Sequence, residues 1–323
     1  MPDSLSENPS HRSAEIGPQA VNEHGLAARL RFHQSWYRLN VLHLTRYGKS
    51  QPHAGGRLMG SILHPVDASA GKNFTTPSAE NHYRLRRKMG WGVDPTRCTS
   101  YMTSSQALTF NVLTPLIDDF IWAARTLSSL LSLSIKQISE ICIEHAPQRR
   151  SLHLGDMTML DCWIELETED GPLGLAIEMK YADRFNSRYI PVAENPKYRA
   201  LADETGLWSL DSSGTKVRAI NQLLRCHALA ASLSTTKRPT SHAPLLLVIH
   251  HPGDRSALKI SDLYRSALHI PDLFKAMPLT QLLDAMQQNA PSRMKAELVK
   301  ELRIRYIDHS LSEAAWEEHQ QSK

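Results

Sequence analysis

Two acids and a lysine are the residues of this sequence best suited to catalysis or metal binding: Asp161, and Glu178 and Lys180 of the run Glu178-Met179-Lys180. Carboxylate oxygens are the ligands that Mg²⁺ prefers, and one or two of them suffice when water and substrate phosphates complete the shell. A metal held in this way lowers the pKa of a bound water and screens the charge that develops on a phosphate group. Because both acids favour the charged form of Lys180, we expect its ammonium to act electrostatically and not as a general base.

Two predicted strands bring these groups together. Residues 161–167 alternate with the period of a half-buried strand, with Cys162, Ile164 and Leu166 on one face and Asp161, Glu165 and Glu167 on the other. The run 169–172 then has the composition of a turn, because Gly171 is free to take a positive φ and Pro172 cannot continue the first strand. On the return strand, Glu178 and Lys180 share one face. The hairpin therefore predicts that Asp161 lies across from this pair.

This segment resembles the PD-(D/E)xK nuclease superfamily, whose motif is an acid at the start of one strand and acid-x-lysine on the next. Here sixteen residues separate Asp161 from Glu178, and Leu160 stands where the family has a proline. The resemblance implies Mg²⁺-dependent hydrolysis of a nucleic-acid phosphodiester, with Mn²⁺ as a possible substitute. It also implies that Asp161 and Glu178 hold the metal and that Lys180 lies near the attacking water. Two other interpretations stay open: a solvated hairpin face with ordinary charges, and a family-like core without activity.

The same resemblance adds two more candidate positions. The superfamily often has a further acid upstream of its aspartate, which makes Glu144 a candidate third metal ligand; alternatively it is a strand-end residue that meets water. Many members carry a glutamine on the helix after the acid-x-lysine strand, a place that Gln222 fits within the predicted helix 216–233. Arg218 and Arg225 fall four residues before and three after Gln222, so they are predicted to share its helical face and bind phosphate. A solvated polar stripe is the alternative.

Upstream of the motif, a helix is predicted from Ser104 to about Leu131, with serine as its cap. This helix is similar to an element of a bacterial branch of PD-(D/E)xK-like proteins. Gln106 and Asn111 either face the active cleft or make capping and surface hydrogen bonds. A basic cluster around Trp91 indicates either a phosphate-binding surface or a solvated helix face. The cluster comprises Arg84, Arg86, Arg87, Lys88 and Arg97.

The order of elements predicts an α/β fold: a restriction-endonuclease-like core with a central mixed β-sheet flanked by helices, plus an N-terminal mainly helical region. A strand over 138–143 precedes the hairpin, and the apolar run 245–250 follows the helix as a strand buried on both faces, which completes a β-α-β crossover. We expect a disordered tail over 1–24, the helical region over 25–133, the core over 134–309 and a polar C-terminal tail over 310–323.

Composition limits the class of protein. The chain has 323 residues, of which 41% are hydrophobic, as in globular proteins. Its four cysteines form no C-x-x-C pair, which argues against a zinc knuckle or a disulfide framework and favours a reducing compartment. There is no signal-peptide pattern and no apolar run of the ~18 residues that span a bilayer, so we expect a soluble, cytoplasmic protein without a membrane partner. No phosphate-binding loop motif supports ATP binding.

The formal net charge of +4 permits nucleic-acid binding without requiring it. The resemblance implies nucleic acid, DNA in the first instance, as the partner, and it allows a homodimer. A catalytically inactive nuclease-fold DNA-binding module is the main alternative to the nuclease, because it needs the basic surfaces but not the metal site. A structural or interaction protein is the third interpretation.

Overall fold

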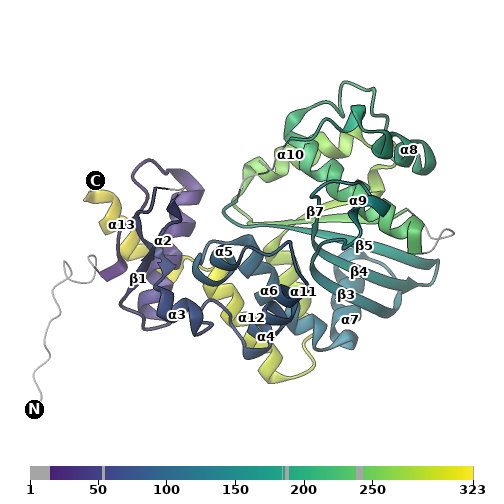
Figure 1. Cartoon of the computed structure of the whole chain (residues 1–323). Helices are drawn as coiled ribbons and strands as arrows, with labels where there is room; N and C mark the ends of the chain where they lie inside the picture. The colour runs from purple at the N-terminus through teal and green to yellow at the C-terminus, as the bar shows by residue number, and fades with distance from the viewer. Residues whose placement is uncertain (1–14, 53–54, 184, 186–188, 238–242, 323) are drawn as a thin grey trace, which may run out of the picture.

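The computed structural model describes residues 15–52, 55–183, 185, 189–237 and 243–322. A five-stranded mixed sheet in the order β3-β4-β5-β6-β7 lies at its centre (Figure 1). The first three strands are antiparallel, and β6 and β7 run parallel to β5. The strand bounds are β3 Ile135–His145, β4 Leu160–Thr168, β5 Gly171–Lys180, β6 Leu245–His250 and β7 Phe274–Pro278. This architecture confirms the predicted fold class, with β7 as a strand that the sequence did not reveal.

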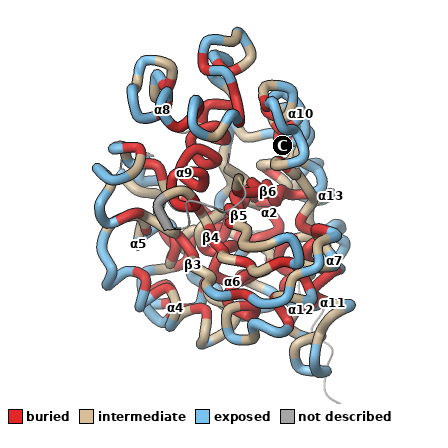
Figure 2. The backbone as a smooth tube through the Cα atoms, turned by 90° about the vertical axis from the view of Figure 1, so that its right-hand side faces the viewer, coloured by how far each residue is buried: buried red, intermediate tan, exposed pale blue. Residues whose placement is uncertain are grey.

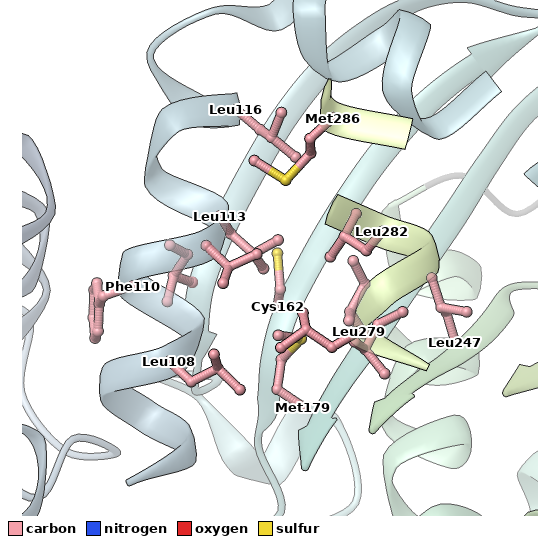
Figure 3. Packing of buried hydrophobic residues seen from close by; sticks show 14 of the residues in the cluster. Leu108, Phe110, Leu113, Leu116, Cys162, Met179, Leu247, Leu279, Leu282 and Met286 are labelled. Atoms are coloured by element: carbon pink, nitrogen blue, oxygen red, sulfur yellow. The ribbon is translucent and has the colours of Figure 1, made fainter. Parts of the chain in front are cut away.

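Helices cover both faces of the sheet, so the core has three layers. One face packs on α6, α7 and α11, where Met179 and Leu247 meet residues of α6 and α11 (Figure 3). The other face packs mainly on α8, α9 and α10, and Trp163 and Ala176 belong to that cluster. The predicted alternation of residues 161–167 is confirmed, because Cys162, Ile164 and Leu166 are buried whereas Asp161, Glu165 and Glu167 are partly exposed. Trp163, on the face of the acids, is the exception at 1% exposed. The bounds are α6 Ser105–Ile117, α7 Phe120–Leu131, α8 Pro196–Thr205, α9 Asn221–Lys237, α10 Arg255–Ala267 and α11 Leu279–Gln288.

Two predicted helices differ in their bounds. The single helix expected over 104–131 is divided at residues 118–119: α6 passes through Pro115 and ends at Ile117, and Asp119 caps a new helix by accepting from the Trp122 N–H at 2.9 Å. The helix expected over 216–233 begins as a 3-10 turn, and α9 proper starts at Asn221. The short 3-10 turns are η2 Arg150–Leu152, η3 Val192–Glu194, η4 Arg218–Ile220, η5 Pro271–Leu273 and η6 Ser310–Ser312.

The N-terminal region is mainly helical, as predicted, with a small antiparallel pair of strands. Its core is continuous with that of the sheet, since Leu30 and Tyr83 belong to the same cluster as Leu247. The division of the chain between residues 133 and 134 stays a prediction. The remaining bounds are α2 Gly25–Asn40, β1 Tyr47–Lys49, β2 Leu58–Leu63, α3 Pro65–Ser69, α4 Pro77–Lys88, α5 Pro95–Ser100, α12 Arg293–Tyr306 and α13 Glu313–Gln321.

The two predicted tails are more ordered than expected where the structure describes them. Residues 1–14 of the tail predicted over 1–24 lie outside the described residues. Ile16 is buried, and its carbonyl accepts from the Arg38 guanidinium at 3.1 Å. At the other end, α13 replaces most of the predicted polar tail and packs on α2 through Phe32 and Trp316, whose ring centroids lie 5.1 Å apart. Figure 2 shows the exposed outer turns around a buried centre. Within the described residues, no helix is both long and apolar enough to span a bilayer.

The buried strand β6 supports the strand that carries Glu178 and Lys180, because Leu247 pairs with Ile177 on β5 and is fully buried. We predict that Leu247→Ala lowers the free energy of unfolding by about 2–5 kcal/mol, since it leaves a cavity between sheet and helices. Urea unfolding followed by circular dichroism measures this change. Leu311→Ala is the control, because Leu311 is 51% exposed; it should change stability by no more than about 0.5 kcal/mol. Equal effects of the two substitutions would contradict the packing described here.

Candidate active site

Three carboxylates lie in a row across three neighbouring strands. Cys162 on β4 pairs with Ile143 on β3 and with Ile177 on β5. One residue further along, these registers place Asp161 between Glu144 and Glu178. Directly opposed residues in a sheet project from the same face. The row lines an open pocket of about 390 Å³, together with Lys180, Gln106 and Gln222 among others.

The central contact of this pocket is a buried ion pair. Lys180 Nζ lies 2.7 Å from Glu178 Oε1, and the two side chains are 6% and 3% exposed. Two groups from α9 add to it, because Gln222 Nε2 donates to Oε1 at 2.5 Å and Cys226 Sγ donates to Oε2 at 3.4 Å. Burial alone lowers the pKa of Lys180, but Glu178 and Asp161 outweigh that effect and raise it above its ordinary value. Lys180 therefore carries its charge at neutral pH.

Asp161 is held by the strand opposite. Its Oδ2 accepts from the Met179 N–H at 2.7 Å, which fixes the carboxylate beside the Glu178 side chain. Burial and the nearby charge of Glu178 raise the pKa of Asp161 to about 8, although Lys180 and the Met179 N–H oppose this shift. Like charges opposite each other in a sheet repel. Without a further cation, Asp161 is therefore predominantly protonated at neutral pH.

Glu144 completes the row from an unusual backbone conformation, with a φ of 51°. Its side chain is fully buried, and its Oε2 accepts from Gln106 Nε2 at 2.8 Å. Arg86 Nε donates to the Glu144 carbonyl at 2.6 Å. Burial and Asp161 raise the pKa of Glu144 well above its ordinary value. Its Oε1 is buried without a hydrogen-bond partner among the described residues, which is costly unless another group satisfies it.

Gln106 faces the cleft, the first of the two alternatives left open for it. Its Nε2 also donates to the Gly92 carbonyl at 3.1 Å, and its Oε1 accepts from the Asp94 N–H at 3.2 Å. Asn111, by contrast, is buried away from the pocket, where it donates to the Tyr306 hydroxyl at 2.7 Å. Only one of the two amides on α6 thus contacts the row of acids.

Two residues at the site were not predicted from the sequence. Asp183 lines the pocket, where it pairs with Arg97 at 2.6 Å and accepts from the Ser105 N–H at 3.2 Å. Cys226 contacts Glu178 from α9. A signal existed for both: Asp183 follows Lys180 by three residues, and Cys226 stands one helical turn after Gln222, so it faces the same way.

The structure does not bring the two predicted arginines to the pocket. Arg225 is buried and donates to Thr158 Oγ1 at 2.9 Å and to Asn221 Oδ1 at 3.2 Å, so its guanidinium is a packing element. Arg218 is exposed in η4, where its guanidinium lies 5.7 Å from the Tyr189 ring centroid. Arg218 does not share the helical face of Gln222, because it lies in a 3-10 turn, whose residues advance by a different angle than those of an α-helix. Arg225 lies on α9 with Gln222, but its buried guanidinium bonds to Thr158 and Asn221 and does not line the pocket.

The residues present fit a divalent cation by type of donor, although they are not preassembled around one. Among the described residues, no three acidic, histidine or cysteine side chains are arranged as a ready metal centre. Glu178 is turned towards Lys180, and Asp161 towards the Met179 N–H. Mg²⁺ needs only one or two carboxylates when waters fill the remaining positions. The unsatisfied Oε1 of Glu144 and the repulsion along the row of acids both favour a bound cation at this place.

Comparison with known proteins gives one match, to a family model. The family model of the PD-(D/E)XK nuclease superfamily matches residues 21–308. No curated protein and no solved structure matches the chain significantly. The matched range contains the three acids, Lys180, Gln106 and Gln222, and it includes the N-terminal helices from α2 onwards.

The raised pKa of Asp161 predicts a pH dependence of stability in the absence of metal. A carboxyl with an ordinary pKa of 3.8 and a folded value of about 8 binds a proton on folding. Its contribution to stability is therefore full below pH ~4 and is lost as the pH rises through ~8. We expect Asp161→Asn to be more stable than the wild type at pH 8 and to lose this advantage as the pH falls towards 5.

Urea unfolding at several pH values in EDTA measures the difference. Asp203→Asn is a matched control, because Asp203 is exposed on α8; its stability relative to the wild type should not vary over this range. An advantage of Asp161→Asn that stays constant with pH would show that Asp161 does not titrate in this way.

Proposed function

The chain belongs to the PD-(D/E)XK nuclease superfamily, and from this premise we propose that it is a divalent-metal-dependent nuclease that hydrolyses phosphodiester bonds in DNA. The observation that carries the proposal is the row of Glu144, Asp161 and Glu178 beside a buried, charged Lys180. So many carboxylates around one ammonium are unfavourable unless a cation is bound. A phosphodiester is a substrate for which such a cation and an ammonium are both useful.

In this proposal, Asp161 and Glu178 hold the cation, and Glu144 offers its unsatisfied oxygen as a third ligand. When bound, Mg²⁺ or Mn²⁺ supplies a water of lowered pKa and neutralises charge on the phosphate. Metal binding requires Glu144 and Asp161, whose pKa values are raised, to lose their protons, so metal binding is weaker at acid pH. All three acids come from strands, which hold their backbones more rigidly than loops would.

Lys180 contributes charge and not proton abstraction. Because its acidic neighbours raise its pKa, the ammonium is available at neutral pH to orient a nucleophilic water and to offset charge on the reacting phosphate. Gln222 and Cys226 restrain the carboxylate of Glu178, and Gln106 restrains that of Glu144. These neutral donors fix the acids without adding positive charge that would compete with a metal.

The experiment is cleavage of linear and circular DNA and of RNA by the purified chain with Mg²⁺, with Mn²⁺ and with EDTA. We predict metal-dependent cleavage of DNA by the wild type. Asp161→Asn and Glu178→Gln should each lower the rate by a hundredfold or more, on the order of the loss when a catalytic group is removed, while affinity for DNA stays similar or rises because negative charge is lost.

Glu169→Gln is the matched control. It removes one carboxylate from the exposed turn between β4 and β5 and should leave the cleavage rate unchanged. A wild type that binds DNA but never cleaves it with either metal would favour the inactive binding module. Cleavage that persists in both Asp161→Asn and Glu178→Gln would remove these acids from the mechanism.

A further inference from the structure

The segment that lines one side of the carboxylate pocket carries an indole ring. Gly92, Met159 and the three acids line this pocket, and Trp91 directly precedes Gly92 in the chain. The Trp91 side chain is half-buried, not packed into the core. The guanidinium of Arg150, in η2, lies 5.1 Å from the Trp91 ring centroid. An aromatic ring and a cation therefore occur together directly next in the chain to a residue of the pocket lining.

Two hydrogen-bonding side chains fix this segment to the acids. Arg86 donates to the carbonyls of both Trp91, at 2.8 Å, and Glu144, at 2.6 Å. Gln106 joins the carbonyl of Gly92 to the carboxylate of Glu144. Gly92 has a φ of 116°, and an added Cβ would lie 2.6 Å from the Arg86 guanidinium, so the chain passes closely here. The position of Trp91 is thus coupled to that of Glu144.

Within the described residues, three arginines of these segments, Arg87, Arg149 and Arg150, have no acidic partner. Arg87 Nη1 donates to the Val93 carbonyl at 3.3 Å, and Arg149 directly precedes Arg150. Arg87 and Arg149 are exposed, and no ion pair between described residues involves Arg87, Arg149 or Arg150. By contrast, three of the other basic residues of the predicted cluster have partners elsewhere: Arg84 pairs with Glu80, Arg97 pairs with Asp183, and Arg86 is buried.

We infer that these residues, here called the Trp91 platform (Trp91, Arg87, Arg149 and Arg150), bind an unpaired strand of DNA and direct it to the row of acids. In this inference, which rests on the proposed function, Trp91 stacks on a base and the arginines bind neighbouring phosphates. Aromatic side chains beside a positively charged groove are the usual means of binding single strands, because every base has a π-face.

An unpaired strand fits better than a duplex for a steric reason. Inside a duplex the faces of each base are covered by their neighbours, so a ring can stack only where the bases are unstacked or at an end. Arg86 holds the backbone of Trp91 and the Arg150 guanidinium lies against its ring, so the ring offers a restrained surface to such a base. The substrate class is therefore single-stranded DNA or a duplex with an unpaired end.

Binding without catalysis tests the inference directly. The probes are a fluorescein-labelled oligothymidine and a fully paired duplex of the same length, followed by fluorescence anisotropy in EDTA at several salt concentrations. We expect the wild type to prefer the single strand. Trp91→Ala should weaken its binding roughly 5- to 150-fold, the range seen when a stacking aromatic residue is removed. Trp91→Phe should retain most of the affinity, whereas Trp91→Leu, which keeps apolar bulk without a π-face, should behave like Trp91→Ala.

Two controls are matched in chemistry. Trp316 is also half-buried with an arginine guanidinium, that of Arg29, at 5.4 Å from its ring, but it lies on α13; Trp316→Leu should leave binding unchanged. Arg149→Gln should lower the slope of log affinity against log salt by about 0.7, the value of one phosphate contact on a single strand. Arg125→Gln, on the exposed side of α7, should leave that slope unchanged.

Circular dichroism checks that the Trp91→Leu variant is folded. The inference fails if this folded variant binds the single strand as tightly as the wild type, or if the wild type prefers the duplex. Cleavage measured in parallel separates this result from the proposed function. DNA cleavage with unchanged binding by the Trp91 variants would overturn only the platform. Binding that depends on Trp91 in a wild type that never cleaves would support the platform and overturn the nuclease.

Discussion

The buried ion pair between Glu178 and Lys180 is the contact on which the site depends. Removing two charges from water is expensive, and their attraction repays that cost only with good geometry and further hydrogen bonds. Here the geometry comes from one strand, because period two places both side chains on the same face of β5. The strand itself is held between β4 and the fully buried β6. The sheet thus fixes one ammonium beside three acids whose ionised forms repel one another, and a bound cation would relieve that repulsion.

The N-terminal region is part of this site and not an appendage to it. Helix α4 supplies Arg86 to the backbone of Glu144, and α6 supplies Gln106 to its side chain. The same two residues hold the Trp91 segment against the pocket. The shared hydrophobic core extends from Leu30 to the sheet, and the family match begins at residue 21. The region predicted separately as helical therefore positions both Glu144 and the Trp91 segment.

Local pattern and family resemblance together anticipated the part of the site that lies within the hairpin. Alternation in 161–167 and the turn after it suffice to place Asp161 across from Glu178 and Lys180. Glu144 joins the row only through the register of β3, which contains two irregularities and a residue with a φ of 51°; no local pattern predicts these. The contact from Gln106 spans 38 residues, so it depends on tertiary packing. The prediction for Arg225 failed for a different reason: helical spacing predicts that it shares a face with Gln222, but it does not predict that the guanidinium is buried.

The central claim is that the row of acids binds a divalent cation. Isothermal titration calorimetry of Mn²⁺, in buffers that differ in ionisation enthalpy, tests it without any nucleic acid. The account predicts binding accompanied by proton release, because burial and mutual repulsion hold protons on Asp161 and Glu144 that the metal must displace. It also predicts that Asp161→Asn and Glu178→Gln each weaken this binding strongly. The account would be contradicted if the wild type did not bind Mn²⁺, or if both variants bound Mn²⁺ as tightly as the wild type.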